Sequence, residues 1–127
     1  MAQKIATREA YGNALAEFGE KYDFLVMDAD LAAATKTSTF KKKFPNRFYD
    51  CGIAEGNMMS VAAGLATAGK VVFASSFAMF ASGRAFEQVR NSIGYPHLNV
   101  NLTRELIYHG EVVCCHDDSS TVFCDFV

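Results

Sequence analysis

The sequence of 127 residues has no tryptophan, only two prolines, and no apolar stretch of the ~18 residues that a membrane-spanning helix needs. It also has no excess of charge of one sign, because 12 Lys and Arg residues stand against 14 Asp and Glu residues, for a formal net charge of −2. Nucleic-acid binding needs a concentrated basic surface. The one basic run, over 41–43, is interpreted as a solvated helix end. We therefore expect neither a membrane nor a nucleic acid as a partner.

A secretory signal is also missing, because the first residues, MAQKIATREA, have no apolar centre. The four cysteines are therefore expected to be reduced thiols in a cytoplasmic protein. What is present is ordinary for a folded domain: half of the residues are hydrophobic and 20% are charged. The length predicts one domain that can bury a core without disulfides or metals.

Helix and strand signals alternate along the chain. The predicted elements are a helix after a Thr7 cap, a strand over 23–27, a short helix over 40–44, a strand over 47–50, a helix over 55–68, a strand over 70–75, a helix over 77–93 and a strand over 98–102. In the first helix Ala10, Leu15, Ala16 and Phe18 suggest a buried stripe. The alternation predicts an α/β fold with a mostly parallel sheet, covered by helices on both faces.

Polar residues follow three of the predicted strands. Asp28 and Asp30 follow the first strand, Glu55 follows the second, and the run Ser-Ser-Phe over 75–77 follows the third. Ligands of open parallel sheets bind at the carboxyl ends of the strands. The topology therefore brings these residues to one edge, although it does not indicate what binds there.

Four blocks of sequence carry a family resemblance: ATREAYGNAL, VMDADL, FPNRFYDCGIAEGNMMSVAAGLA and FASSFAMFASGRAFEQVRNSIGYPHLNV. Their order and spacing resemble the pyrimidine-binding domain of transketolases, above all that of split bacterial enzymes. Similar blocks occur in deoxyxylulose-phosphate synthase and in β subunits of pyruvate-dehydrogenase-type enzymes, but FAMFASGRAFEQVRNSI favours transketolase. The likeness covers residues 1–100 of a single predicted domain, 1–127, and leaves 101–127 as a divergent tail. It implies a three-layer, parallel-sheet sandwich that binds thiamine diphosphate.

The resemblance implies a catalytic role for Glu55. In such enzymes the glutamate of the GIAE run shares a proton with the pyrimidine ring of thiamine diphosphate, which helps the cofactor to lose its reactive thiazolium proton. The alternative is that Glu55, in the first turn of a helix, only complements the helix dipole, an effect worth about 0.3–1 kcal/mol.

The same resemblance implies contacts for four further residues. Phe77 and Phe80 match aromatic residues that hold the aminopyrimidine ring, and an i, i+3 spacing would put both on one helical face. The alternative is that both are core residues of an amphipathic helix. Asp30 matches an aspartate near the thiazolium ring and the donor sugar. Arg8 matches an arginine that helps to bind the sugar phosphate, where the alternative is an ordinary surface charge.

The chain also departs from the family pattern. Gly56 stands where the family commonly has glutamine, and three alanines over 32–34 stand where related enzymes carry serines, one of them a phosphate ligand. The family's histidine- and glycine-rich segment and its further C-terminal domain have no counterpart after HLNV. These differences weaken the expectation of donor-sugar binding.

The tail contains soft metal ligands, namely His109, Cys114, Cys115, His116 and Cys124. Their spacing is poor for zinc, because Cys114 and Cys115 are adjacent and no C-x₂-C pair exists. We therefore expect no metal site. The abrupt change of composition could instead come from a frameshift or a gene rearrangement.

Three hypotheses remain open. In the first, this chain joins a separate pyrophosphate-binding subunit that holds Mg²⁺, and together they transfer a two-carbon ketol unit between phosphosugars. In the second, it is a truncated, non-catalytic remnant or a dimerisation scaffold. The third is a metal- or redox-responsive module built on the tail. A homodimer is the family expectation, and the segment 121–127 is predicted to cover an exposed sheet edge.

Overall fold

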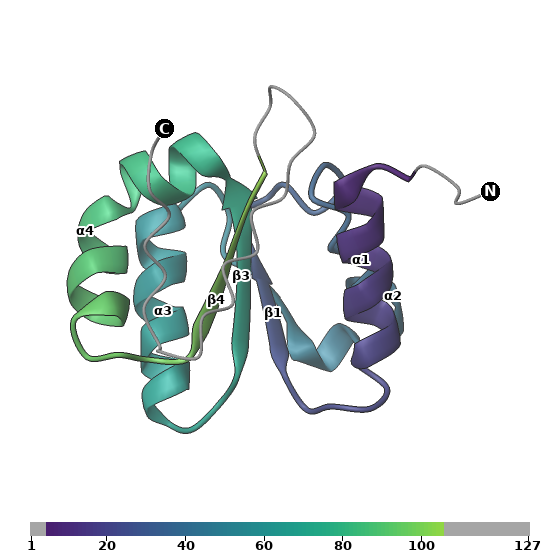
Figure 1. Cartoon of the computed structure of the whole chain (residues 1–127), viewed down its shortest axis with the longest axis horizontal. Coiled ribbons are helices and arrows are strands. Elements are labelled where there is room, and N and C mark those ends of the chain that lie inside the picture. The colour runs from purple at the N-terminus through teal and green to yellow at the C-terminus, as the bar shows by residue number, and fades with distance from the viewer. Residues whose placement is uncertain (1–4, 106–127) are drawn as a thin grey trace.

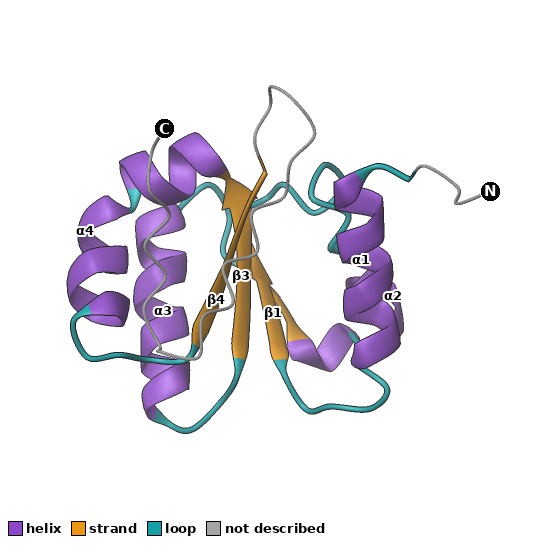
Figure 2. Ribbon diagram, in the orientation of Figure 1, coloured by secondary structure: helices purple, strands orange, loops and turns teal. Residues whose placement is uncertain are grey.

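A computed structural model of the chain describes residues 5–105 (Figures 1 and 2). The predictions on the tail beyond residue 105, including the cover strand over 121–127 and the cysteine and histidine cluster, lie outside the described residues. The elements are α1 (Thr7–Phe18), β1 (Leu25–Asp28), α2 (Ser38–Lys43), η1 (Pro45–Arg47), β2 (Phe48–Asp50), α3 (Glu55–Thr67), β3 (Val72–Phe77), η2 (Phe80–Arg84), α4 (Phe86–Gln88), η3 (Val89–Gly94) and β4 (Val100–Glu105). Over the described part of the chain, a membrane-spanning helix is ruled out by length and hydropathy.

The four strands form one parallel sheet in the order β2-β1-β3-β4. Figure 1 shows α1 and α2 on one face of this sheet, and α3 with the helical segment around α4 on the other. Each connection between parallel strands must cross the sheet, and the helices supply these crossovers. The predicted α/β three-layer sandwich is confirmed.

The central strand β1 is buried on both faces because its side chains alternate between two apolar clusters. Val26 packs with Phe40 on the side of α1 and α2, whereas Met27 packs with Met58 and Met59 on the side of α3. This arrangement explains why the strand is a continuous apolar run in the sequence. Asp28, the last residue of β1, is the only polar residue of this strand.

The start of α1 differs from the prediction. Its N-cap is Ala6 and makes no side-chain capping bond, so Thr7 is the first helical residue rather than the cap. The buried residues are Gly12, Leu15 and Ala16, while Ala10 is exposed and Phe18 is 47% exposed. Gly12 is buried because the chain at Lys36 passes so close that a Cβ would lie 2.5 Å from the Lys36 carbonyl oxygen.

The predicted helix over 77–93 was wrong in two respects. Phe77 belongs to β3, because its backbone continues the parallel ladder opposite Glu105 of β4. The helical segment that follows is also not a regular α-helix, since η2 and η3 are π-helices on either side of the short α4. Its buried residues are Ala81, Ala85 and Ile93. Wide turns of this kind are frequent at functional sites.

Candidate functional site

The carboxyl ends of β1, β2 and β3 lie at the same end of the sheet, as the topology predicts. This end is the carboxyl edge, and the end where the strands begin is the amino edge. The turn after β2 is built around Gly52, whose φ of +67° suits glycine. The Asp50 carboxylate accepts hydrogen bonds from the backbone N–H of Gly52, at 3.1 Å, and of Asp30, at 3.0 Å. One side chain thus ties the loop after β1 to the turn after β2, and this turn leads directly into α3.

Glu55 is the first residue of α3 and is only 1% exposed. A buried carboxylate is costly unless it is paired. Its partner is Arg84, whose Nη1 lies 3.0 Å from Glu55 Oε2. The other oxygen, Oε1, has no hydrogen-bond partner among residues 5–105. The helix start also favours negative charge here.

The two predicted aromatic residues lie together beside this ion pair. The ring centroids of Phe77 and Phe80 are 6.0 Å apart, with 30° between the ring planes. They do not share a helical face, as predicted, because Phe77 ends β3 and Phe80 begins η2. The guanidinium carbon of Arg84 lies 4.5 Å from the centroid of Phe80. Arg84 therefore covers part of the Phe80 ring and contacts Glu55 at the same time.

Comparison with known proteins identifies the family. The match to the family described as "Transketolase, pyrimidine binding domain" covers residues 3–114. This chain belongs to that family. The buried glutamate, the aromatic pair and the three-layer sheet therefore occur together in a transketolase pyrimidine-binding domain.

Individual relatives show how much of a longer protein this domain represents. A protein of Methanocaldococcus jannaschii, described as a transketolase C-terminal section, is 50% identical over 119 residues, which are 93% of this chain and 37% of that protein. A 6-deoxy-6-sulfo-D-fructose transketolase subunit of a Clostridium species is 46% identical over 96 residues, or 75% of this chain and 30% of that protein. The chain thus spans about a third of these relatives.

A solved structure, described as a split gene transketolase in an inactive beta4 tetramer, is also similar. It superimposes with a TM-score of 0.71 and 61% sequence identity, over 79% of this chain and 34% of that chain. This likeness agrees with the parallel sheet described above.

The transketolase-type domain has a second buried carboxylate, at Asp28, which the sequence placed at this edge without identifying its partners. Asp28 accepts hydrogen bonds from the Thr35 hydroxyl at 2.7 Å, the Thr37 hydroxyl at 2.8 Å and the Leu31 N–H at 2.6 Å. Burial raises the pKa of Asp28, and the charge of Asp50 adds to the rise, while the three hydrogen bonds oppose it. This cluster orders the loop between β1 and α2.

The remaining predicted residues lie around the same edge or near it. Asp30 is exposed, with a φ of +62°, in the loop that Asp50 holds. Arg8 is exposed in the first turn of α1. Their roles in binding stay predictions.

The sequence placed Ser75 and Ser76 at this edge, but it indicated neither Tyr11 nor the surroundings of the two serines. The Tyr11 hydroxyl of α1 lies 2.9 Å from the Ser75 hydroxyl at the end of β3, so α1 reaches the carboxyl edge. The neighbouring Ser76 hydroxyl is buried and has no hydrogen-bond partner among the described residues. No sequence pattern joins Tyr11 to Ser75, because 64 positions separate them.

Cys51, which follows Asp50 in the turn after β2, is a free cysteine. Burial raises the pKa of its thiol, and the nearby charges of Asp50 and Asp28 raise it further. A thiol with a raised pKa is a poor nucleophile near neutral pH. Within residues 5–105 no group of three or more His, Cys, Asp or Glu side chains is placed to hold a metal ion.

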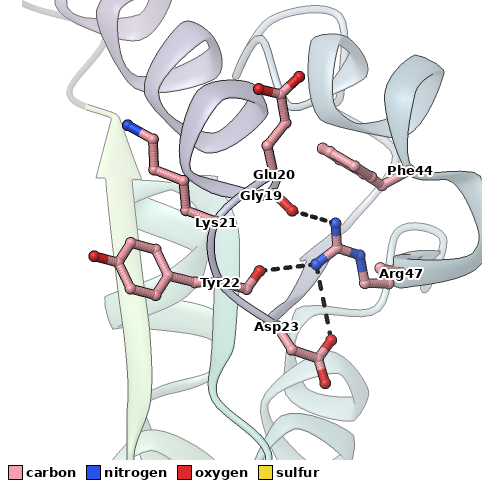
Figure 3. Close-up of a pocket in the computed structure, with 7 residues that line it drawn as sticks. All are labelled: Gly19, Glu20, Lys21, Tyr22, Asp23, Phe44 and Arg47. Carbon is pink, nitrogen blue, oxygen red and sulfur yellow. Dashed lines mark hydrogen bonds and ion pairs between the residues drawn. The ribbon is translucent and has the colours of Figure 1, made fainter.

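Figure 3 shows a hollow that lies at the opposite edge, where β1 and β2 begin. Arg47 spans it by donating hydrogen bonds to the carbonyl oxygens of Gly19 and Tyr22, and it lies 3.8 Å from the Asp23 carboxylate. Its guanidinium also lies over the ring of Phe44, 4.2 Å from the centroid. The donors of Arg47 are thus used to brace the loop between α1 and β1, and this hollow is structural rather than part of the site.

Proposed function

We propose that this chain is the pyrimidine-binding subunit of a split transketolase, in which Glu55 hydrogen-bonds the aminopyrimidine ring of thiamine diphosphate. The observation that carries the proposal is the state of the Glu55 carboxylate. It is buried at a helix start, one of its oxygens is bound by Arg84, and the other has no protein partner among the described residues. An oxygen of a largely buried carboxylate that no protein group binds can accept a hydrogen bond from a ligand.

The residues around Glu55 fit this ring. Phe77 is partly buried and lies beside Phe80, so an apolar face is available for a flat heterocycle. When bound, thiamine diphosphate supplies the electron sink for breaking a carbon–carbon bond next to a ketose carbonyl. In this proposal Glu55 holds a proton at the ring nitrogen, and the aromatic side chains orient the ring.

The rest of the cofactor belongs to a partner in this proposal. Mg²⁺ and the diphosphate are held by a separate pyrophosphate-binding subunit, which agrees with the description of relatives as a section or a subunit of a transketolase. Asp30 lies toward the thiazolium ring and the donor sugar, and Arg8 binds the sugar phosphate. The complex transfers a two-carbon ketol unit between phosphosugars in the cytoplasm, with this domain as a homodimer.

Turnover of a reconstituted enzyme tests the proposal. The purified chain is mixed with the pyrophosphate-binding subunit of a split transketolase, thiamine diphosphate and Mg²⁺, and ketol transfer is measured. We expect turnover only with both subunits, and a loss of about 10²–10⁴-fold in Glu55→Ala, the range typical of a lost acid–base group. Glu17→Ala is the matched control, because Glu17 is exposed on α1. Full activity of Glu55→Ala would disprove the role of Glu55.

A non-catalytic assembly is the second candidate function. It is favoured by the three alanines over 32–34, which lack the hydroxyl expected to bind the sugar phosphate, and by the solved structure described as an inactive beta4 tetramer. A stable complex with the partner subunit and no turnover would support this candidate. Light scattering of the chain alone would give its oligomeric state.

A further inference from the structure

We infer that Arg84 is a positioning residue: it binds one oxygen of Glu55 and thereby presents the other oxygen to the pyrimidine ring nitrogen. The inference rests on the proposed function and adds a residue to it. Arg84 lies 29 positions after Glu55, in η2, and it is the only partner of the Glu55 carboxylate among the described residues.

The geometry of the contact is one-sided. A guanidinium can bind both oxygens of a carboxylate at once, which is the strongest form of this pair. Here the contact within hydrogen-bond distance joins Arg84 Nη1 to Glu55 Oε2, at 3.0 Å. If the pair served only to neutralise a buried charge, the two-oxygen form would serve better. The one-oxygen form leaves Oε1 for another donor.

Arg84 is itself held in place. Its guanidinium carbon lies 4.5 Å from the centroid of Phe80, and η2 begins at Phe80 and ends at Arg84. A cation over an aromatic face is attracted to it. Because Arg84 is 51% exposed, it would otherwise move freely in solvent, and the two contacts restrict it. Phe80 therefore also helps to hold Arg84 beside Glu55.

Binding of two cofactor forms to the reconstituted complex tests this role. The probes are thiamine diphosphate and its analogue with CH in place of the ring nitrogen that faces Glu55, each with Mg²⁺, measured by isothermal titration calorimetry. We expect Arg84→Gln to weaken the binding of thiamine diphosphate about tenfold, or about 1.4 kcal/mol. Binding of the analogue, which makes no hydrogen bond to Glu55, should weaken by less than about twofold in the same variant. Arg84→Lys keeps the charge and should recover part of the loss.

Arg90→Gln is the matched control, since Arg90 is similarly exposed and pairs with Glu87 on the surface, 3.4 Å away. Equal weakening of both probes by Arg84→Gln, or no weakening of either, would overturn the positioning role. If the wild-type complex fails to distinguish the two probes, the Glu55 contact itself is wrong, and the proposed function fails before Arg84 is considered. If Arg84→Gln does not fold, the test uses Arg84→Lys instead. We then expect the binding of thiamine diphosphate to weaken more than the binding of the analogue. An equal change for both probes would contradict the positioning role.

Discussion

At the scale of residues, Asp28 and Glu55, the two buried carboxylates within residues 5–105, have different surroundings. Asp28 receives three hydrogen bonds from its own loop, so it is satisfied within the chain. Glu55 receives one, from a half-exposed arginine, and keeps an oxygen without a described partner. A fully satisfied carboxylate orders a loop, whereas a partly satisfied one is poised for a ligand. This contrast supports the proposal that Asp28 orders its loop whereas Glu55 binds a ligand.

The raised pKa of Asp28 predicts how stability depends on pH. In the window between the ordinary aspartate pKa and the raised native value, the unfolded chain has lost its proton while the folded chain still holds it. Stability contributed by this proton is therefore present below the window and lost as pH rises through it. Asp28→Asn has no proton to lose. Urea unfolding at a series of pH values should show the free energy of unfolding of wild type falling, relative to Asp28→Asn, across that window. Parallel curves would contradict the raised pKa of Asp28.

The sequence identified Glu55, Phe77 and Phe80 because these residues lie in linked blocks of a known family. It could not identify Arg84 as the partner of Glu55. The two residues are 29 positions apart, and only the packing of η2 against α3 brings them together. A pairing set by tertiary contact has no local signature, which is also why the bond between Tyr11 and Ser75 was missed.

At the scale of elements, the regular parts were predictable and the irregular helix was not. The predicted helix over 55–68 agrees with α3 to within a residue, because small and apolar residues recur at helical spacing and Gly69 follows with a φ of +83°. The segment over 78–94 has a similar apolar pattern, yet it contains two π-helices. The spacing of apolar side chains indicates which face of a helix is buried. It does not indicate whether a turn contains the one extra residue that makes it a π-helix.

Two glycines in helices predict opposite effects of the same substitution. Gly64 lies within α3, and a methyl group added to it would meet nothing within 4 Å, so Gly64→Ala should stabilise the fold by about 0.5–1 kcal/mol. Gly12 lies in α1, where a methyl group would meet the Lys36 carbonyl oxygen at 2.5 Å. Gly12→Ala should therefore destabilise the fold by about 1–3 kcal/mol, as overpacking does. Urea unfolding of the two variants measures both values. Stabilisation by Gly12→Ala would show that the loop at Lys36 does not pack against α1.

At the scale of the whole molecule, the carboxyl and amino ends of the sheet differ in what their polar side chains bind. The carboxyl edge carries Glu55, Phe77 and the Asp28 loop, and the amino edge carries the Arg47 brace shown in Figure 3. Because the brace uses backbone carbonyls as acceptors, it holds the start of β1 without offering a ligand site. In the proposed function, the carboxyl edge presents one part of a binding site, and the partner subunit supplies the other.

This division predicts that thiamine diphosphate stabilises the complex and leaves the single chain nearly unchanged. A ligand that binds only the folded state adds about 2.7 kcal/mol at a hundred times its dissociation constant. For a domain of 127 residues, 1 kcal/mol shifts the melting temperature by several degrees, in the range of about 2–8 °C. Circular dichroism melts with thiamine diphosphate and Mg²⁺ should therefore show a rise of several degrees for the mixture of both subunits, and almost none for this chain or the partner alone. Glu55→Ala should reduce the rise in the mixture, because the ring nitrogen loses its acceptor. An equal rise for the isolated chain would mean that the chain binds the whole cofactor without a partner, and the split-site proposal would then be wrong.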